Sequence, residues 1–395
     1  AKWIDNLVVR ASYGLQGNID KNTSPFLLGN YRIENILPGG SEDMIDVSGA
    51  PNKKLRWEKT HSVNAGFDFA VLNQAINLSV DYYYRKGVDL IGTQMLPLET
   101  GFEMLTVNWA SMRNQGVEVA LSTRNVHTKN FMWTTNFNFA YNNNKVLKEA
   151  LREDALEPGR EGYPAGALFA LKTAGLDEEG YPMFQDKDGK AVSAMEFFKL
   201  QEWGFGATDL TARERRELYT YVGTADCPYT GGFNNTFTYK AFELGVNFSF
   251  DFGGKVRSQP TYSIVDFDKG RNTNRDILNR WTPENTETIF PVLLSQNERL
   301  DEYMWYSNQN EIYRNLDIWI RDLNYVRLQN IRLGYTLPTN FSRTLGMTSA
   351  TVAIEGRNLL VFGSSYKNYL DPETMSNAYA TPAPKSVTLS LNLIF

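Results

Sequence analysis

Apolar and polar side chains alternate along many segments of the chain. The clearest run covers residues 242–253, where apolar side chains from Phe242 to Phe252 occupy every second position and polar or small side chains occupy the others. A period of two is that of a β-strand, because successive side chains point to opposite faces of a sheet. Similar runs lie at residues 7–15, 63–71, 76–85, 117–122, 131–142, 235–239, 325–337, 351–362 and 386–395. The pattern predicts an all-β protein with about ten strands, each with one apolar and one polar face.

The connections between these strands alternate in length. Tight links at 72–74, 126–130 and 240–241 alternate with long links at 18–54, 90–113, 146–232 and 254–324. Transmembrane barrels have short periplasmic turns and long extracellular loops, whereas a soluble sandwich has no reason to separate loop lengths in this way. The parity therefore favours a transmembrane antiparallel β-barrel with long extracellular loops. Two local features are also predicted, a β-bulge near Gln329 where the alternation changes phase, and a short amphipathic helix within 193–218.

Composition agrees with a barrel and excludes several other classes of protein. Among the 395 residues, 40 are Lys or Arg and 45 are Asp or Glu, which excludes a basic protein that binds nucleic acid. The hydrophobic content of 42% is too high for a disordered chain. No apolar run approaches the roughly 18 residues that a membrane helix needs. The mean hydropathy is nevertheless −0.40, as expected when only one side chain in two faces lipid.

Few residues are available for catalysis or metal binding. Cys227 is the single cysteine, which excludes a disulfide framework and a thiolate cluster. The two histidines, His61 in a strand and His127 in a tight turn, have no set of nucleophile, base and orienting group around them, so we expect solvated or lumen-facing roles and no enzyme. Asp186 and Asp188 resemble the start of a calcium loop without its bidentate glutamate, which leaves a weak calcium site or a plain acidic turn. No other cofactor is predicted.

Two sets of side chains are candidates for contact with a ligand or a partner. The polar strand faces would line the lumen of a barrel. These lumen-facing candidates are Asn64, Asp68, Asn77, Asp81, Glu118, Asn136, Asn138, Asn247 and Asp251. Aromatic rings in the long loops would stack on sugars, contact a partner, or pack the loops themselves. The loop candidates are Trp203, Tyr219, Tyr221, Trp281, Tyr303, Trp305, Tyr306 and Trp319.

A series of motifs, in order along the chain, resembles the SusC/RagA-like TonB-dependent outer-membrane transporters of Bacteroidota. The first two are R-A-S-Y-G followed by G-N at 10–18 and L-R-W-E-K-T at 55–60. The others lie at 81–84, 89–91, 112–118, 229–237, 279–285, 328–338, 356–359 and 371–373. The resemblance covers essentially all of residues 1–395 and identifies them as a C-terminal portion of a receptor barrel.

The resemblance implies parts that are not in these 395 residues. It implies a larger barrel of about 22 strands, an N-terminal plug inside it, and a TonB-interacting segment before the plug. We expect the plug and the N-terminal strands to be absent from this chain. The implied partners are a SusD-like surface lipoprotein that covers the external face, TonB acting through the missing part, and outer-membrane lipid.

The expected function is active import of nutrients across the bacterial cell outer membrane, driven by TonB, with a chain that crosses the membrane many times. The expected substrates are glycan oligosaccharides or peptides, because nothing in the loops separates the two. The alternatives are a passive porin and a surface-binding barrel, both without a plug. The sequence upstream of this chain decides between them and the importer. A barrel enzyme would need a catalytic set that the loops do not supply.

Overall fold

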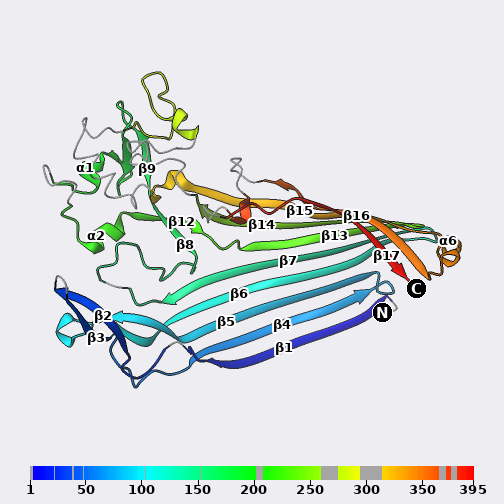
Figure 1. Cartoon of the computed structure of the whole chain (residues 1–395), viewed down its shortest axis with the longest axis horizontal. Coiled ribbons are helices and arrows are strands. Elements are labelled where there is room, and N and C mark those ends of the chain that lie inside the picture. The colour runs from blue at the N-terminus through cyan, green and yellow to red at the C-terminus, as the bar shows by residue number, and fades with distance from the viewer. Residues whose placement is uncertain are drawn as a thin grey trace. The chain divides into compact units, whose positions relative to one another are not determined.

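The computed structural model describes residues 3–21, 23–37, 40–47, 49–102, 104–151, 153–201, 208–258, 275–293, 314–363, 371–374 and 380–395. Ten long strands make up one antiparallel sheet, in the order β1-β4-β5-β6-β7-β13-β14-β15-β16-β17 (Figure 1). The strands are β1 (Ile4–Asn18), β4 (Glu58–Val71), β5 (Ile76–Met95), β6 (Met104–His127), β7 (Phe131–Lys148), β13 (Tyr229–Tyr239), β14 (Phe242–Arg257), β15 (Ile320–Thr336), β16 (Ser349–Phe362) and β17 (Ser386–Ile394). The prediction of an all-β chain with about ten long antiparallel strands is confirmed.

The first compact unit comprises Ala1–His127, Trp133–Glu153 and Gly159–Ala165. It holds β1, β4, β5, β6 and nearly all of β7. A separate hairpin of β2 (Gly29–Leu37) and β3 (Gly40–Val47) lies in the connection from β1 to β4. The tight turn from β4 to β5 contains Leu72, Asn73 and Gln74, which all have positive φ (58°, 54° and 56°). Three successive non-glycine residues in the left-handed region are uncommon, so this turn is conformationally constrained.

One connection in the first unit is shorter than the sequence predicts. The sequence placed a long link at 90–113, but β5 continues to Met95 and β6 begins at Met104, so only a short connection with η1 (Leu98–Thr100) remains. The register of β5 and β6 shifts between Gly87 and Leu90, and Asp89 has φ 57°. This bulge changes the phase of the alternation, which is why the pattern appeared to end there.

The second compact unit comprises Thr128–Met132, Asp154–Pro158 and Gly166–Phe395. It carries β13 to β17 together with a loop subdomain, which is formed by the connection that precedes β13 and by described residues of the connection between β14 and β15. In that subdomain β8 (Ala167–Leu171) pairs with β12 (Tyr219–Thr224), and β10 (Pro182–Gln185) pairs with both β9 (Thr173–Leu176) and β11 (Ala191–Val192). The bulge predicted near Gln329 is confirmed, because the register of β15 against β16 shifts between Leu328 and Asn330.

The helices of the described residues are short. Residues 193–218 contain α1 (Ala194–Phe197) and α2 (Ala212–Glu217) rather than one helix. Ser193 caps α1, and a capping box of Thr211 and Glu214 begins α2, so each helix has its own start signal. The remaining helices are η2 (Arg275–Asn279), η3 (Asp317–Trp319), α6 (Thr339–Thr344) and η4 (Pro372–Thr374). Among the described residues, no helix has the length and apolar character that a membrane crossing requires.

The main cluster of buried hydrophobic residues in the second unit lies in the loop subdomain, and a few further residues, such as Leu328 and Ala350, are buried on the long strands. Phe184, Phe197 and Phe198 pack ring against ring with centroids 4.8–5.2 Å apart. Leu171 and Trp319 belong to the same cluster and are fully buried. Burial of several aromatic and aliphatic side chains stabilises the subdomain by roughly 1.5–3 kcal/mol for each large side chain.

Candidate functional site

The apolar face of β1 and β4 is exposed. Leu7, Val9 and Leu15 of β1 and Val63 and Phe67 of β4 lie on one face according to their register, and all five are exposed, with Val9 reaching 77%. A soluble protein rarely exposes a continuous apolar surface of this kind, whereas a membrane barrel presents it to lipid. This face therefore suits contact with hydrocarbon.

The opposite face of the same strands carries a charged network around Arg10. The guanidinium Nη1 lies 3.0 Å from Asp68 and Nη2 lies 2.9 Å from Asp81, so one arginine joins β1, β4 and β5. The hydroxyl of Ser79 donates to Asp68 at 2.7 Å. Gly66 lies between Arg10 and Asp81 in the register, and it leaves room for this network because a Cβ there would lie 2.1 Å from the Asp81 carboxylate. The charges are partly exposed, so the network contributes polarity and position more than stability.

The polar face continues across β5, β6 and β7. The hydroxyl of Tyr83 donates to Asn142 Oδ1 at 2.9 Å, and the side chain of Asn144 donates to Asn114 Oδ1 at 2.6 Å. Gly116 lies opposite Tyr83 in the register and leaves room for its ring, because a Cβ there would meet the phenol oxygen at 2.6 Å. The first unit thus has one continuous polar surface.

The structure places the lumen-facing candidates on polar faces. Register and alternation put the first-unit candidates on the same face as Arg10. They are Asn64, Asp68, Asn77, Asp81, Glu118, Asn136 and Asn138. In the second unit, Asn247 and Asp251 share a face of β14 with Ser249, which accepts a hydrogen bond from Gln329 at 2.7 Å. The structure fixes the face that these residues share, and their contact with a lumen stays a prediction.

A buried ionic network ties the connection between β16 and β17 to β15. The side chain of Arg327 is only 2% exposed; its Nε donates to Glu373 at 2.8 Å and its Nη2 donates to Asp371. The hydroxyl of Tyr325 donates to Asp251 and lies 3.3 Å from Glu373. Asp371 also accepts from the backbone N–H groups of Glu373 and Ala383, at 3.1 and 3.2 Å. Each buried charge is therefore paired, which is the condition for keeping it buried.

Sequence reasoning missed Tyr325 and Arg327. A signal was available, because an arginine in the middle of a spanning strand is costly unless a carboxylate pairs with it. The partner carboxylates, Asp371 and Glu373, stand more than 40 residues away in the motif D-P-E at 371–373. The alternation pattern does not reveal contacts over that separation.

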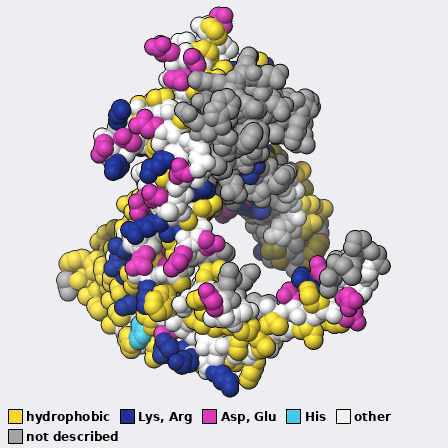
Figure 2. All heavy atoms as spheres, turned by 90° about the vertical axis from the view of Figure 1, so that its left-hand side faces the viewer, with side chains coloured by type: hydrophobic (Ala, Val, Ile, Leu, Met, Phe, Trp, Pro, Cys, Tyr) yellow, Lys and Arg dark blue, Asp and Glu magenta, His cyan; other side chains and the backbone are white. Residues whose placement is uncertain are grey.

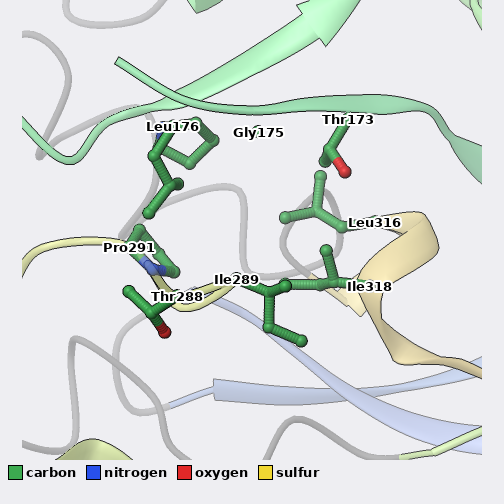
Figure 3. A pocket seen from close by; sticks show the side chains of 9 residues that line it. Thr173, Gly175, Leu176, Thr288, Ile289, Pro291, Leu316 and Ile318 are labelled. Carbon is green, nitrogen blue, oxygen red and sulfur yellow. The ribbon is translucent and has the colours of Figure 1, made fainter. Parts of the chain in front are cut away.

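The loop subdomain contains a small apolar cavity of about 150 Å³. The side chains of Leu176, Ile289 and Leu316 lie around it (Figure 3). The full lining is Thr173, Gly175, Leu176, Pro182, Thr288, Ile289, Pro291, Leu316 and Ile318. The hydroxyl and N–H of Thr173 already donate to Asp317 Oδ1, at 2.6 and 3.2 Å. A cavity of this size and lining suits one small apolar group and offers little to a sugar.

The aromatic loop candidates that the structure describes differ in exposure. Tyr221 is exposed at 37% and packs edge-on against Phe169, with ring centroids 5.9 Å apart. Tyr219 and Trp281 are half-buried. Trp319 is completely buried in the subdomain core, so its indole packs the loops, which is one of the three roles considered for these rings. Trp203, Tyr303, Trp305 and Tyr306 lie outside the described residues.

The structure defines the surroundings of His61 and Asp186. His61 lies on the apolar face and not on the lumen-facing one, because it pairs with Leu15 in the register and its Nδ1 is 2.9 Å from the hydroxyl of Tyr13. Asp186 forms a turn, since its Oδ1 accepts the N–H groups of Asp188 and Lys190 at 2.9 and 2.8 Å. Among the described residues, no group of three or more His, Cys, Asp or Glu could hold a metal ion. The choice between a weak calcium site and a plain acidic turn stays a prediction.

The loop end of the chain presents a mixed surface. Figure 2 shows basic and acidic side chains (dark blue and magenta) interspersed with hydrophobic ones. The formal net charge of −5 is small for the length of the chain. Such a surface suits a neutral or mixed ligand or a protein partner better than a highly charged polymer.

Residues 1–167 match the family model described as TonB dependent receptor-like, beta-barrel. Two curated relatives are TonB-dependent receptor P3 of Formosa agariphila, 27% identical over 98% of this chain and 39% of its own length, and TonB-dependent receptor SusC of Bacteroides thetaiotaomicron, 26% identical over 87% and 32%. The structure of the RagAB peptide transporter superposes with a TM-score of 0.75 at 23% identity, over 100% of this chain and 41% of that one. The chain thus spans about two fifths or less of the length of these relatives.

Proposed function

Because the chain is a SusC/RagA-like portion of a TonB-dependent receptor barrel of the outer membrane, we propose that it supplies wall and external loops to an active nutrient importer. Proteins of this family are transporters, and the chain is not an enzyme. The chain is one part of a larger barrel, in which residues outside it supply the plug and the remaining strands.

The observation that carries the proposal is the division of the strands into two unlike faces. The exposed apolar face suits lipid, and the face around Arg10, Tyr83 and Asn144 suits a hydrated path. Substrate would pass along the polar face once the plug is displaced. The chemistry is therefore binding and release in a polar channel, with no covalent step.

The proposed partners follow from the same family. A SusD-like lipoprotein would cover the external loops, and TonB would act on a segment outside this chain to displace the plug. The structural likeness to the RagAB peptide transporter supports a partnered barrel of this kind. The loop subdomain, which has its own core and an apolar cavity, is the part of the described chain best suited to meet substrate or lid.

The proposed substrates are peptides or glycan oligosaccharides. The aromatic loop residues, Tyr221 among those described, suit stacking on sugars, whereas the cavity at Leu176 and Ile289 suits an apolar peptide side chain. A passive porin or a surface-binding barrel is the alternative, because both use the same two-faced strands.

The test uses the full-length receptor in its own cells. Growth on a defined peptide mixture, and separately on single oligosaccharides, is compared among wild type, a receptor deletion and a strain lacking TonB. An importer requires that both deletions abolish growth on the same nutrient. Growth that needs the receptor but not TonB identifies a porin, and growth that needs neither, with ligand still retained at the cell surface by the receptor, identifies a surface-binding barrel.

A further inference from the structure

Three basic side chains form a row across neighbouring strands on the apolar face of the first unit. His61 of β4 pairs with Lys86 of β5, and Lys86 pairs with Arg113 of β6. Paired residues on adjacent strands lie about 5 Å apart and point to the same side of the sheet. That side is the exposed apolar one, because Val63 occupies the same face two residues from His61.

A fourth basic residue, Lys145 of β7, shares this face. The hydrogen bond from Asn144 to Asn114 places both asparagines on the polar face. Their chain neighbours Lys145 and Arg113 therefore point to the opposite, apolar side. The row thus spans the four strands β4 to β7, and we name His61, Lys86, Arg113 and Lys145 the basic row.

The described residues supply no carboxylate partner to the three cations of the basic row. Among the described residues, Lys86, Arg113 and Lys145 make no ion pair, whereas the nearby Lys59 is neutralised by Asp89 at 3.3 Å. The Nε of Arg113 is buried and lacks any hydrogen-bond acceptor within the described part of the chain. A buried donor without an acceptor is costly, so the described residues leave this guanidinium with an unmet need for an acceptor.

The position of the row along the strands matches a membrane boundary. Ten residues of β4 separate His61 from Val71, which adjoins the tight turn. At roughly 3.3 Å per residue and a strand tilt of about 40°, this is a height of about 25 Å, equal to the apolar band of an outer-membrane barrel. Tyr13 and Tyr82, both exposed, lie just inside the row, as expected of an interfacial girdle.

We propose that the basic row binds the phosphate groups of lipid headgroups in the outer leaflet of the outer membrane. Arginine and lysine are suitable phosphate ligands, and the row stands on the long-loop side of the lipid-facing band. A ligand at this place must carry phosphate at the row and acyl chains over Val63 and Phe67, which a phosphorylated glycolipid does. His61 contributes its Nε2, since its Nδ1 is already hydrogen-bonded to Tyr13.

The test uses the full-length receptor purified from outer membranes in detergent. Native mass spectrometry measures Kd for three probes: lipid A with its phosphates, the same lipid A after dephosphorylation, and inorganic phosphate. The double variant Lys86→Gln/Arg113→Gln should bind phosphorylated lipid A about 30-fold more weakly than wild type, from the contribution of two surface cations. Wild type should prefer phosphorylated over dephosphorylated lipid A by a similar ratio.

Two controls separate lost charge from lost fold. Arg85→Gln removes a cation from the residue next to Lys86 on the opposite face, and it should change Kd by less than about threefold. Lys86→Arg/Arg113→Lys keeps both charges and should keep binding. Equal lipid binding by the double variant and wild type overturns the proposal, as does an equal loss in Arg85→Gln. Inorganic phosphate binding as tightly as lipid A would identify a soluble-anion site, and loss of a co-purified lipoprotein with lipid retained would identify a protein interface; either result also overturns it.

Discussion

Replacing Arg327 by methionine tests whether the buried ionic network holds the connection between β16 and β17 in place. The side chains of Arg327 and Asp371 are 2% and 5% exposed, so removal of the arginine leaves a buried carboxylate without its counter-ion. Breaking one side of such a pair costs about 3–5 kcal/mol. The carboxylate can avoid this cost by moving into water, which detaches η4 from β15.

The expected result is local opening. A cost of about 3 kcal/mol corresponds to roughly a 100-fold faster exchange of amides that exchange through that opening. The amide of Thr374 is the reporter, because it donates to the backbone oxygen of Asp371 at 2.9 Å and loses no direct partner in Arg327→Met. Hydrogen–deuterium exchange on the full-length receptor measures it.

The matched control is Arg357→Met on the neighbouring strand β16. Arg357 pairs with Glu355 at 2.5 Å, but its side chain is 61% exposed, and exposed pairs contribute at most about 1 kcal/mol. Exchange at Thr374 should therefore change by less than about threefold in this variant. If Arg327→Met changes the exchange of Thr374 no more than Arg357→Met does, the network does not fasten this segment and the reasoning is wrong.

Two further predictions concern the strand faces and α2. On a Cys227→Ser background, a cysteine at Phe248 should react with a membrane-partitioned maleimide and a cysteine at Asn247 with a water-soluble one; the reverse pattern would refute the assignment of faces. Hydrogen bonds from the backbone N–H and hydroxyl of Thr211 lower the pKa of Glu214, so its contribution to α2 is fully present above the unfolded pKa of about 4.3 and is lost as pH falls through the lower folded value. Amide protection of Ala212–Glu217 should fall on acidification, and Thr211→Ala should already lack that protection at neutral pH.

The strands can be predicted well from the sequence because contact with lipid on one face produces a regular alternation of apolar and polar residues. Where one face meets hydrocarbon and the other meets water, every second position must be apolar along a whole span, and the run from Phe242 to Phe252 follows this rule. The same alternation also predicts the face of His61, because residues two positions apart on a strand share a face and Val63 is on the apolar one. That inference needed only the alternation to be extended to the start of β4.

The parts that the sequence does not predict depend on contacts between distant residues. The loop subdomain joins β8 to β12 across some 50 residues, and its strands are too short for a period to be visible. The sequence does not distinguish Trp319 from the other loop aromatics, because its burial depends on Phe290 and the core residues that pack around it. The pairing of Arg327 with Asp371 is likewise a result of register and loop path, which no local pattern encodes.

The separate core of the loop subdomain means that the chain places apolar residues according to two different environments, the lipid bilayer and water. On the exposed apolar face of the long strands an apolar residue points outward and contacts lipid, whereas around Phe184 and Trp319 it points inward and contacts neighbouring side chains. Replacing a leucine by an aspartate therefore places a charge against lipid on the long strands, but places it in a packed protein core in the loop subdomain. Because the two sets of residues are distinct, the external part is free to diverge toward new ligands while the membrane wall stays as it is.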